Sequence, residues 1–101
     1  MIVSAGYNIA GPEVESALLA HPAVAECGVV GVPDAERGQI VKAVVVLRPG
    51  YTPGEALTKA LQDFVKRTIA PYKYPRAVEF VAALPRTETG KLQRFRLRQP
   101  T

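Results

Sequence analysis

A single lysine near the end of the chain has a setting that suits electrostatic chemistry. Lys91 follows Gly90 in the segment PRTETGKLQRFRLR, which covers residues 85–98. A lysine ammonium is a compact charge on a long stem, so it can reach a carboxylate or phosphate oxygen. The segment is not a P-loop, because Pro85 replaces the first glycine and Leu92 replaces the hydroxyl residue that binds magnesium. Two interpretations of Lys91 therefore stay open: a loop that presents its charge to a ligand, or a turn exposed only to solvent. The segment alone favours the solvated turn.

Positive charge gathers around this lysine and in the run APYKYPR before it. Tyr72 and Tyr74 alternate with cations in that run, and an aromatic ring beside a cation can hold a base and its phosphates. The basic cluster comprises Lys73, Arg76, Arg86, Lys91, Arg94, Arg96 and Arg98. It fits RNA, a nucleotide cofactor or a solvated surface.

Gly6 stands out in the stretch SAGYNIAGPEVE, where the pattern predicts a tight apolar hairpin. A glycine at such a place often allows a ligand to approach the backbone closely. The plainer interpretation is that Gly6 only makes the turn.

The other reactive side chains exclude several classes of site. Cys27 is the one cysteine and lies in an apolar stretch, where we expect a small core residue. Without a second thiol or histidine at metal spacing, we expect no metal site, and a lone cysteine favours a reducing compartment such as the cytoplasm. No apolar run reaches membrane-spanning length, so no membrane partner is expected. The net charge of +4 is too moderate to identify a partner.

Hydrophobic periodicity and turn residues predict the elements that position these side chains. In chain order we expect a hairpin over 1–9, a helix over 10–22, strands over 24–32 and 39–47, a helix over 58–69, a strand over 77–81 and a short helix over 92–98. A loop is expected over 33–38, and Leu57, Leu61, Phe64, Val65 and Thr68 form one apolar stripe. The fold class is therefore α+β, a small mostly antiparallel sheet with packed helices and an N-terminal hairpin. The 101 residues, 48% apolar and 22% charged, suit one globular domain.

Three segments, MIVSAGYNIAGPEVE, GVPDAERGQIVKAVVVL and APYKYPRAVEFVAALPRTETGKLQR, together resemble the C-terminal domain of the AMP-forming acyl-CoA synthetases in order and spacing. Within these adenylate-forming enzymes the chain looks most like 2-aminobenzoate-CoA and benzoate-CoA ligases. The apolar start and the missing hinge aspartate lead us to expect that residues 1–101 are a lid domain cut from a longer protein at the hinge.

The resemblance implies a two-step reaction of the full-length enzyme, with the isolated chain inactive. A carboxylic acid and Mg-ATP give an acyl-adenylate and pyrophosphate, and coenzyme A then gives the thioester and AMP. The partner is the large N-terminal adenylation domain of the same protein, which holds most of the ATP, coenzyme A and acid sites. No cofactor is expected in the isolated domain, and no nucleic acid is expected as a partner.

The resemblance also implies roles for five residues. Lys91 matches the adenylation lysine, which bridges the substrate carboxylate and the α-phosphate. Gly6 matches the glycine beside the pantetheine tunnel in the thioester-forming state. Tyr72, Lys73 and Arg76 match the region that holds the coenzyme A nucleotide in some members.

Two departures from the family pattern bear on coenzyme A. Ala5 replaces the first glycine of a Gly-Gly pair found in many members, while the second glycine is kept. Asn8 takes the place of an arginine that meets coenzyme A phosphate in some members, and it cannot supply that charge.

Two rival interpretations stay open. One is a small basic module that binds a nucleotide or RNA through Tyr72, Lys73, Arg76 and the C-terminal arginines. The other is a free-standing interaction domain without a ligand. RNA binding would weaken steeply with salt and need no partner domain, whereas the ligase interpretation requires the large domain.

Overall fold

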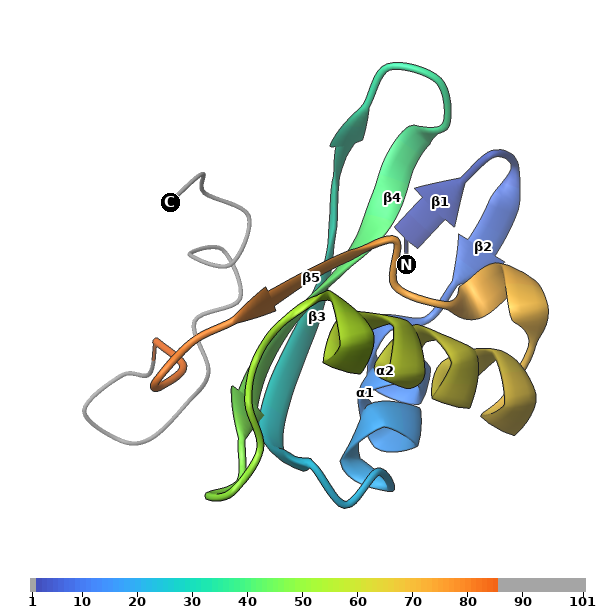
Figure 1. The fold of residues 1–101 in the computed structure, drawn as a ribbon. Helices are drawn as coiled ribbons and strands as arrows, with labels where there is room; N and C mark the ends of the chain where they lie inside the picture. The colour runs from blue at the N-terminus through green and yellow to red at the C-terminus, as the bar shows by residue number, and fades with distance from the viewer. Residues whose placement is uncertain (1, 86–101) are drawn as a thin grey trace.

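The computed structural model describes residues 2–85 and forms a small α+β domain (Figure 1). Its elements in order are β1 (Ile2–Ser4), β2 (Tyr7–Ile9), α1 (Gly11–Leu19), β3 (Val24–Asp34), β4 (Gly38–Leu47), α2 (Glu55–Thr68), the 3₁₀ turn η1 (Pro71–Lys73) and β5 (Ala77–Phe80). The predicted fold class, with its N-terminal hairpin and packed helices, is confirmed. The predicted helix over 92–98 lies outside the described residues.

The main sheet has the order β3-β4-β5. β3 and β4 form a long antiparallel hairpin with Cys27 opposite Val45, while β5 runs parallel to β4 with Val78 beside Ala43. Parallel neighbours need a crossover connection, and α2 provides it. The sheet is therefore mixed, although its longest pairing is antiparallel as expected.

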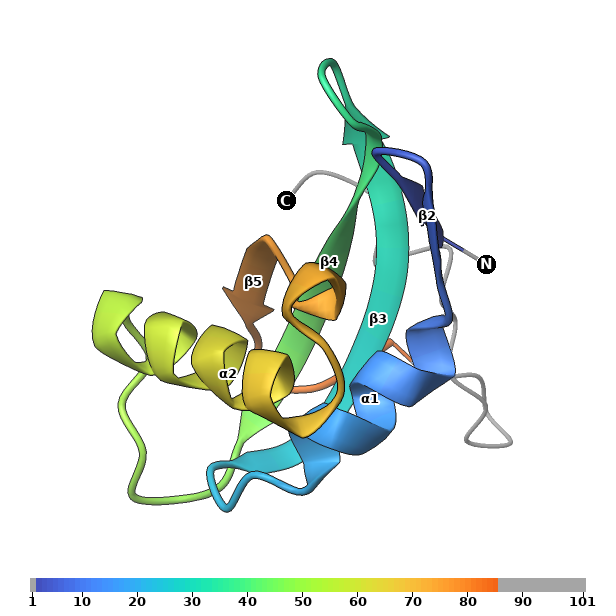
Figure 2. The same cartoon turned by 90° about the vertical axis from the view of Figure 1, so that its right-hand side faces the viewer.

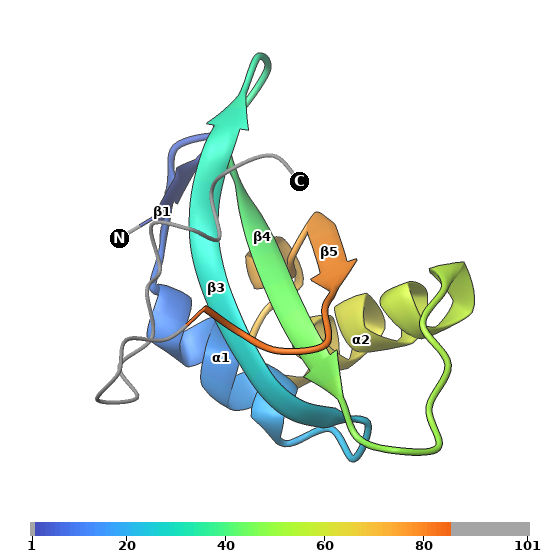
Figure 3. The same ribbon diagram turned by 90° about the vertical axis from the view of Figure 1, so that its left-hand side faces the viewer.

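Both helices cover the same face of this sheet (Figures 2 and 3). Strand residues alternate between the two faces, so Val29 and Ala43 face the helices and join the larger core. That core also takes Leu18 from α1 and Leu61 from α2, both fully buried. Burying one such leucine stabilises the fold by about 1.5–3 kcal/mol.

The opposite face carries a smaller apolar cluster. Val30 and Val44 are buried there against Leu84. Figure 3 shows the segment after β5 crossing in front of β4 and β3, which brings Leu84 over these valines. The segment after β5 thus covers Val30 and Val44 on the sheet face that the helices do not cover.

Three predicted boundaries are wrong by two or three residues. Helix α1 ends at Leu19 rather than at residue 22. β3 continues through Pro33 to Asp34, so the expected loop over 33–38 shrinks to residues 35–37. Pro33 is tolerated because β3 is an edge strand, where a missing N–H costs least. Helix α2 begins at Glu55, three residues before the expected start, and its acidic first residue suits the positive helix N-terminus.

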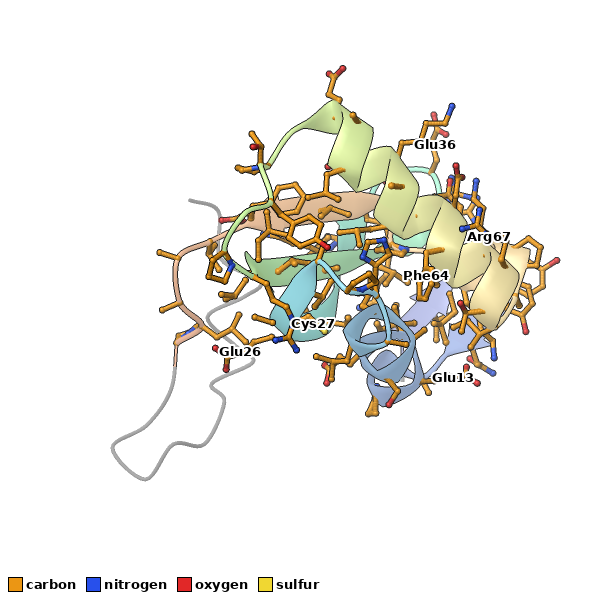
Figure 4. The ribbon with its side chains drawn as sticks, turned by 60° about the horizontal axis from the view of Figure 1, so that its bottom comes forward. Glu13, Glu26, Cys27, Glu36, Phe64 and Arg67 are labelled. Carbon is orange, nitrogen blue, oxygen red and sulfur yellow. The ribbon has the colours of Figure 1, made fainter. Side chains whose placement is uncertain are left out.

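The apolar stripe of α2 is shorter than expected. Leu61 and Val65 are buried, whereas Thr68 is exposed and its hydroxyl donates a hydrogen bond to the Phe64 carbonyl at 2.6 Å. Figure 4 shows Phe64 on α2, and its ring meets that of His21, after α1, edge-on at 5.0 Å.

Cys27 is a core residue as predicted. It is buried, and its thiol donates to the Glu15 carbonyl of α1 at 3.5 Å (Figure 4).

Candidate functional site

Gly6 lies at the exposed tip of the β1–β2 hairpin. Ser4 pairs with Tyr7, so the loop contains only Ala5 and Gly6. Both have positive φ, 49° at Ala5 and 86° at Gly6, as the tightest hairpin turns require. A Cβ added at Gly6 would meet nothing within 4 Å. The turn itself therefore calls for glycine, and the space in front of it is open to whatever approaches the domain.

Tyr72 lies against this hairpin. Its ring stacks on Tyr7 with centroids 4.5 Å apart and planes 25° from parallel. Tyr7 is 51% exposed and Tyr72 is 40% exposed, so the pair forms an aromatic surface directly beside the glycine turn. Residues more than sixty positions apart in sequence are thus neighbours here.

Lys73 is tied to the first turn of α1. Its ammonium lies 2.5 Å from the Glu13 carboxylate and 5.7 Å from the centre of the Tyr72 ring. The hydrogen bond to Glu13 raises the pKa of Lys73 above its usual value of 10.5. Lys73 is therefore a firmly charged group whose position is fixed by α1.

Arg76 belongs to a different surface. Its guanidinium lies 4.8 Å from the centre of the Tyr74 ring, and the Lys66 ammonium of α2 lies 4.3 Å from the same ring. Each cation is attracted by the face of the ring, and the Lys66 ammonium also lies 3.9 Å from the Asp63 carboxylate. The structure thus joins Tyr72 and Lys73 to the N-terminal segment and joins Arg76 to α2.

A groove of about 520 Å³ runs beside Tyr74 along α2. Its size falls in the range of small-molecule sites. Its walls are Glu55, Thr58, Lys59, Gln62, Asp63, Lys66, Tyr74 and Arg76. The sequence paired Tyr74 with Arg76 as an aromatic-cation pattern but gave no role to Lys66, which lies in the polar positions of the α2 pattern. Only the fold brings Lys66 to this ring.

A second groove lies at the end of β4 and β5. It measures about 440 Å³ and includes Arg48, Tyr51 and Phe80 among its walls. No residue that the sequence put forward as functional lines it.

Lys91 and the arginines that surround it lie outside the described residues, so their predicted roles stay predictions. Within residues 2–85 there is no group of three or more His, Cys, Asp or Glu that could hold a metal ion. In the same range no helix is long and apolar enough to span a membrane.

Comparison with protein families gives one match over most of the chain. Residues 13–91 match the family described as AMP-binding enzyme C-terminal domain. The human protein named "Acyl-coenzyme A synthetase ACSM1, mitochondrial" is 55% identical over 101 residues, which are 98% of this chain and 18% of that protein. The chain thus spans less than a fifth of the length of this curated relative.

Solved structures show the same likeness in three dimensions. An acyl-CoA synthetase from Brucella canis has a TM-score of 0.93 and 52% identity over 96% of this chain and 18% of that one. An anthranilate CoA ligase in complex with anthranoyl-AMP has a TM-score of 0.85 and 47% identity over 97% of this chain and 19% of that one.

Proposed function

Because the chain belongs to the AMP-binding enzyme C-terminal domain family, we propose that it is the mobile domain of an AMP-forming carboxylic acid–CoA ligase. The observation that carries this proposal is the match over residues 13–91 together with relatives that are acyl-CoA synthetases. In those relatives the matching part is under a fifth of the chain. A large N-terminal domain of the same protein is the partner that the proposal requires.

The proposed reaction has two steps that need different surfaces of this domain. In the first step a carboxylate oxygen attacks the α-phosphorus of ATP, and pyrophosphate leaves. In the second step the coenzyme A thiol loses its proton and attacks the acyl carbon, and AMP leaves. Mg²⁺ enters with ATP in this scheme, and residues 2–85 supply no cluster of ligands for it.

Lys91 is the proposed adenylation residue. Its ammonium would neutralise charge shared by the substrate carboxylate and the α-phosphate, which is electrostatic stabilisation and positioning rather than proton transfer. The support is its place in the motif TGK within a segment that matches the family.

Gly6 is the proposed wall of the pantetheine tunnel. The open space in front of the hairpin tip supports this role, since a side chain at Gly6 would project away from this domain and into whatever faces it. The stacked rings of Tyr7 and Tyr72 lie beside the turn and would form a further part of the tunnel wall.

The nucleotide part of coenzyme A is proposed to lie near Tyr72, Lys73 and Arg76. Among these, the contacts favour Arg76, because it lies on Tyr74 in the groove along α2. Lys66 adds a second cation on the same ring. A base stacked near Tyr74 with phosphates toward these cations combines the two interactions that nucleotide sites use.

The acid is proposed to be aromatic, with 2-aminobenzoate or benzoate as the first candidates. The likeness to an anthranilate CoA ligase supports this choice. The acyl pocket belongs to the large domain, so aliphatic acids are the alternative result of the experiment below. The RNA-binding module considered from the sequence receives no support from the relatives, which are CoA ligases and acyl-CoA synthetases.

The test uses the full-length protein that contains this domain. It is incubated with ATP, Mg²⁺, coenzyme A and single acids, namely 2-aminobenzoate, benzoate, butyrate and octanoate. The proposal predicts acyl-CoA, AMP and pyrophosphate in equal amounts, with the aromatic acids turned over fastest. Release of ADP and phosphate, or no thioester from any acid, would contradict the proposed reaction. A clear preference for butyrate or octanoate would contradict only the choice of acid.

A further inference from the structure

Arg37, in the turn between β3 and β4, makes an unusual connection to the hairpin that carries Gly6. Its side-chain Nε donates a hydrogen bond to Ser4 Oγ at 3.1 Å, and its carbonyl accepts one from the Ala5 amide at 2.9 Å. A single residue therefore holds the strand end and the turn of a hairpin more than thirty positions away. Figure 1 shows β1 lying beside β4, close to the tip of the β3–β4 hairpin.

The receiving hydroxyl is inside the structure. Ser4 is only 2% exposed and is the one buried polar residue among those described. A buried hydroxyl needs a hydrogen-bond partner, because leaving it unpaired costs free energy. Arg37 contributes the charged donor, and a hydrogen bond to a charged group is among the stronger kinds.

The turn that Arg37 holds is strained. Ala5 has φ of 49°, a left-handed conformation that costs an L-residue about 1–2 kcal/mol. Such conformations persist where the surroundings determine them, and here the Ala5 amide is bonded to the Arg37 carbonyl. Arg37 thereby helps to fix the conformation of the residue directly before Gly6.

Arg37 is itself positioned by its own turn. The Asp34 carboxylate accepts hydrogen bonds from the backbone amides of Glu36 and Arg37 at 3.2 and 2.9 Å. Gly38 follows with φ of 81°, which completes a three-residue hairpin loop. The β3–β4 turn is thus a defined platform rather than a loose loop.

The hairpin also sits closely on β3. A Cβ added at Gly31 would lie 3.1 Å from Ile2 Cγ2 and 3.2 Å from the Gln39 side chain, which accepts a hydrogen bond from the Val3 amide. The absence of a side chain at Gly31 therefore allows β1 to dock at this depth. The close packing of β1 on β3 and the hydrogen bonds of Arg37 together fix the position of the Ala5-Gly6 turn relative to the main sheet.

We propose that Arg37, through Ser4 and Ala5, is a positioning residue for the thioester-forming step. It keeps the Ala5-Gly6 turn at the depth needed to form the tunnel wall, while the proposed adenylation residue, Lys91, comes from the sequence after residue 85. This inference rests on the proposed function of Gly6, and it gives the β3–β4 turn a role that is mechanical and specific to one half-reaction.

The experiment compares both half-reactions in the full-length protein for Ser4→Ala, Arg37→Met, the double variant and Gly31→Ala. Pyrophosphate exchange with benzoate measures adenylation, and the reaction of supplied benzoyl-adenylate with coenzyme A measures thioester formation. If the wild-type enzyme turns over another acid faster than benzoate, that acid and its adenylate are used in both assays. Ser4→Ala and Arg37→Met are each expected to slow thioester formation about tenfold, the effect of one such hydrogen bond, and to leave pyrophosphate exchange within about twofold.

The double variant separates positioning from a direct contact with coenzyme A. If Arg37 acts through Ser4, the double variant is no slower than the slower single variant. Gly31→Ala removes no polar group but crowds Ile2 and Gln39 beneath the hairpin, and it is expected to show the same selective defect. Deuterium uptake by residues 2–9 is expected to rise in all four variants, because the hairpin is less firmly held.

Three results would overturn the positioning role in an active wild-type enzyme. The first is an unchanged rate of thioester formation in Ser4→Ala. The second is an equal fall in the rates of both half-reactions in the single variants. The third is a double variant whose loss in thioester rate is the product of the two single losses. A wild type that forms no thioester with any acid would instead contradict the proposed function, and the two failures are therefore distinguishable.

Discussion

Gly6 combines a backbone that needs glycine with an empty space in front of it, and these two properties can be tested apart. Gly6→Leu in the full-length enzyme is expected to slow thioester formation from supplied acyl-adenylate about a hundredfold, because the side chain would displace the reacting thiol. Pyrophosphate exchange is expected to stay near the wild-type rate. Both rates are measured on the same preparation.

Gly50 provides the matched control for this substitution. It too has positive φ, 95°, and open space where a Cβ would stand, so Gly50→Leu carries a similar backbone strain of about 1–2 kcal/mol. Both half-reactions should survive in Gly50→Leu. Loss of adenylation with thioester formation intact in Gly6→Leu would refute the tunnel role.

Tyr74 tests the groove along α2. Tyr74→Leu keeps an apolar side chain but removes the ring that Lys66 and Arg76 flank. Since stacking on an aromatic ring contributes about 1–3 kcal/mol per base, the KM for coenzyme A should rise roughly tenfold, with pyrophosphate exchange unchanged. Tyr51→Leu, an exposed tyrosine of the other groove, is the control. An equal rise in both variants would remove the groove from the proposed site.

At the scale of elements, the ion pair between Lys73 and Glu13 links η1 to the start of α1. Folding raises the pKa of Lys73 above 10.5, chiefly through the hydrogen bond to Glu13. The folded state thus favours the protonated lysine, so the stabilisation is complete below pH 10.5 and is lost as pH rises through the raised pKa.

The corresponding measurement compares urea unfolding of the 101-residue chain and its Lys73→Met variant at neutral pH and above pH 10.5. The variant is expected to be less stable at neutral pH, with a difference that shrinks at the higher pH. Because the two proteins differ only at position 73, the difference between their free energies of unfolding is the informative quantity. Lys59→Met, on the exposed side of α2, should show no such trend, and a pH-independent difference for Lys73→Met would contradict the link.

Which elements form could be predicted from the sequence, because apolar periodicity and turn residues are local signals. The β1–β2 hairpin, both described helices and all three strands of the main sheet appear where the pattern puts them. The ends were harder to predict near Pro33 and Glu55, since the effect of a proline or glycine depends on whether the strand is an edge or the helix is packed. The parallel pairing of β5 with β4 is a property of the whole topology and has no local signal.

At the scale of the whole molecule, the sequence suggested candidate residues but not their neighbours in the fold. Gly6, Tyr72, Lys73, Arg76 and Lys91 came from segments that resemble a family. The partners that the structure adds come from elsewhere in the chain, namely Tyr7 for Tyr72, Glu13 for Lys73 and Lys66 for Tyr74. These contacts depend on how α1, α2 and η1 pack, which no short motif encodes.

The two proposed reacting groups, Gly6 and Lys91, come from opposite ends of the sequence. The glycine turn is held by β1, β2 and the β3–β4 turn, whereas Lys91 belongs to the segment after β5. The proposed function therefore assigns a different part of the chain to each of the two half-reactions. Under this proposal, substitutions at Gly6 and at Lys91 affect different half-reactions.

The most direct test of this account is the effect of Lys91→Ala on the two half-reactions of the full-length enzyme. Pyrophosphate exchange should fall by about 10²–10³ or more, the loss typical of removing one stabilising charge or donor. Thioester formation from supplied acyl-adenylate should stay within about twofold of wild type, because the proposed function gives Lys91 no part in that step. Pyrophosphate exchange at the wild-type rate in Lys91→Ala would contradict the account.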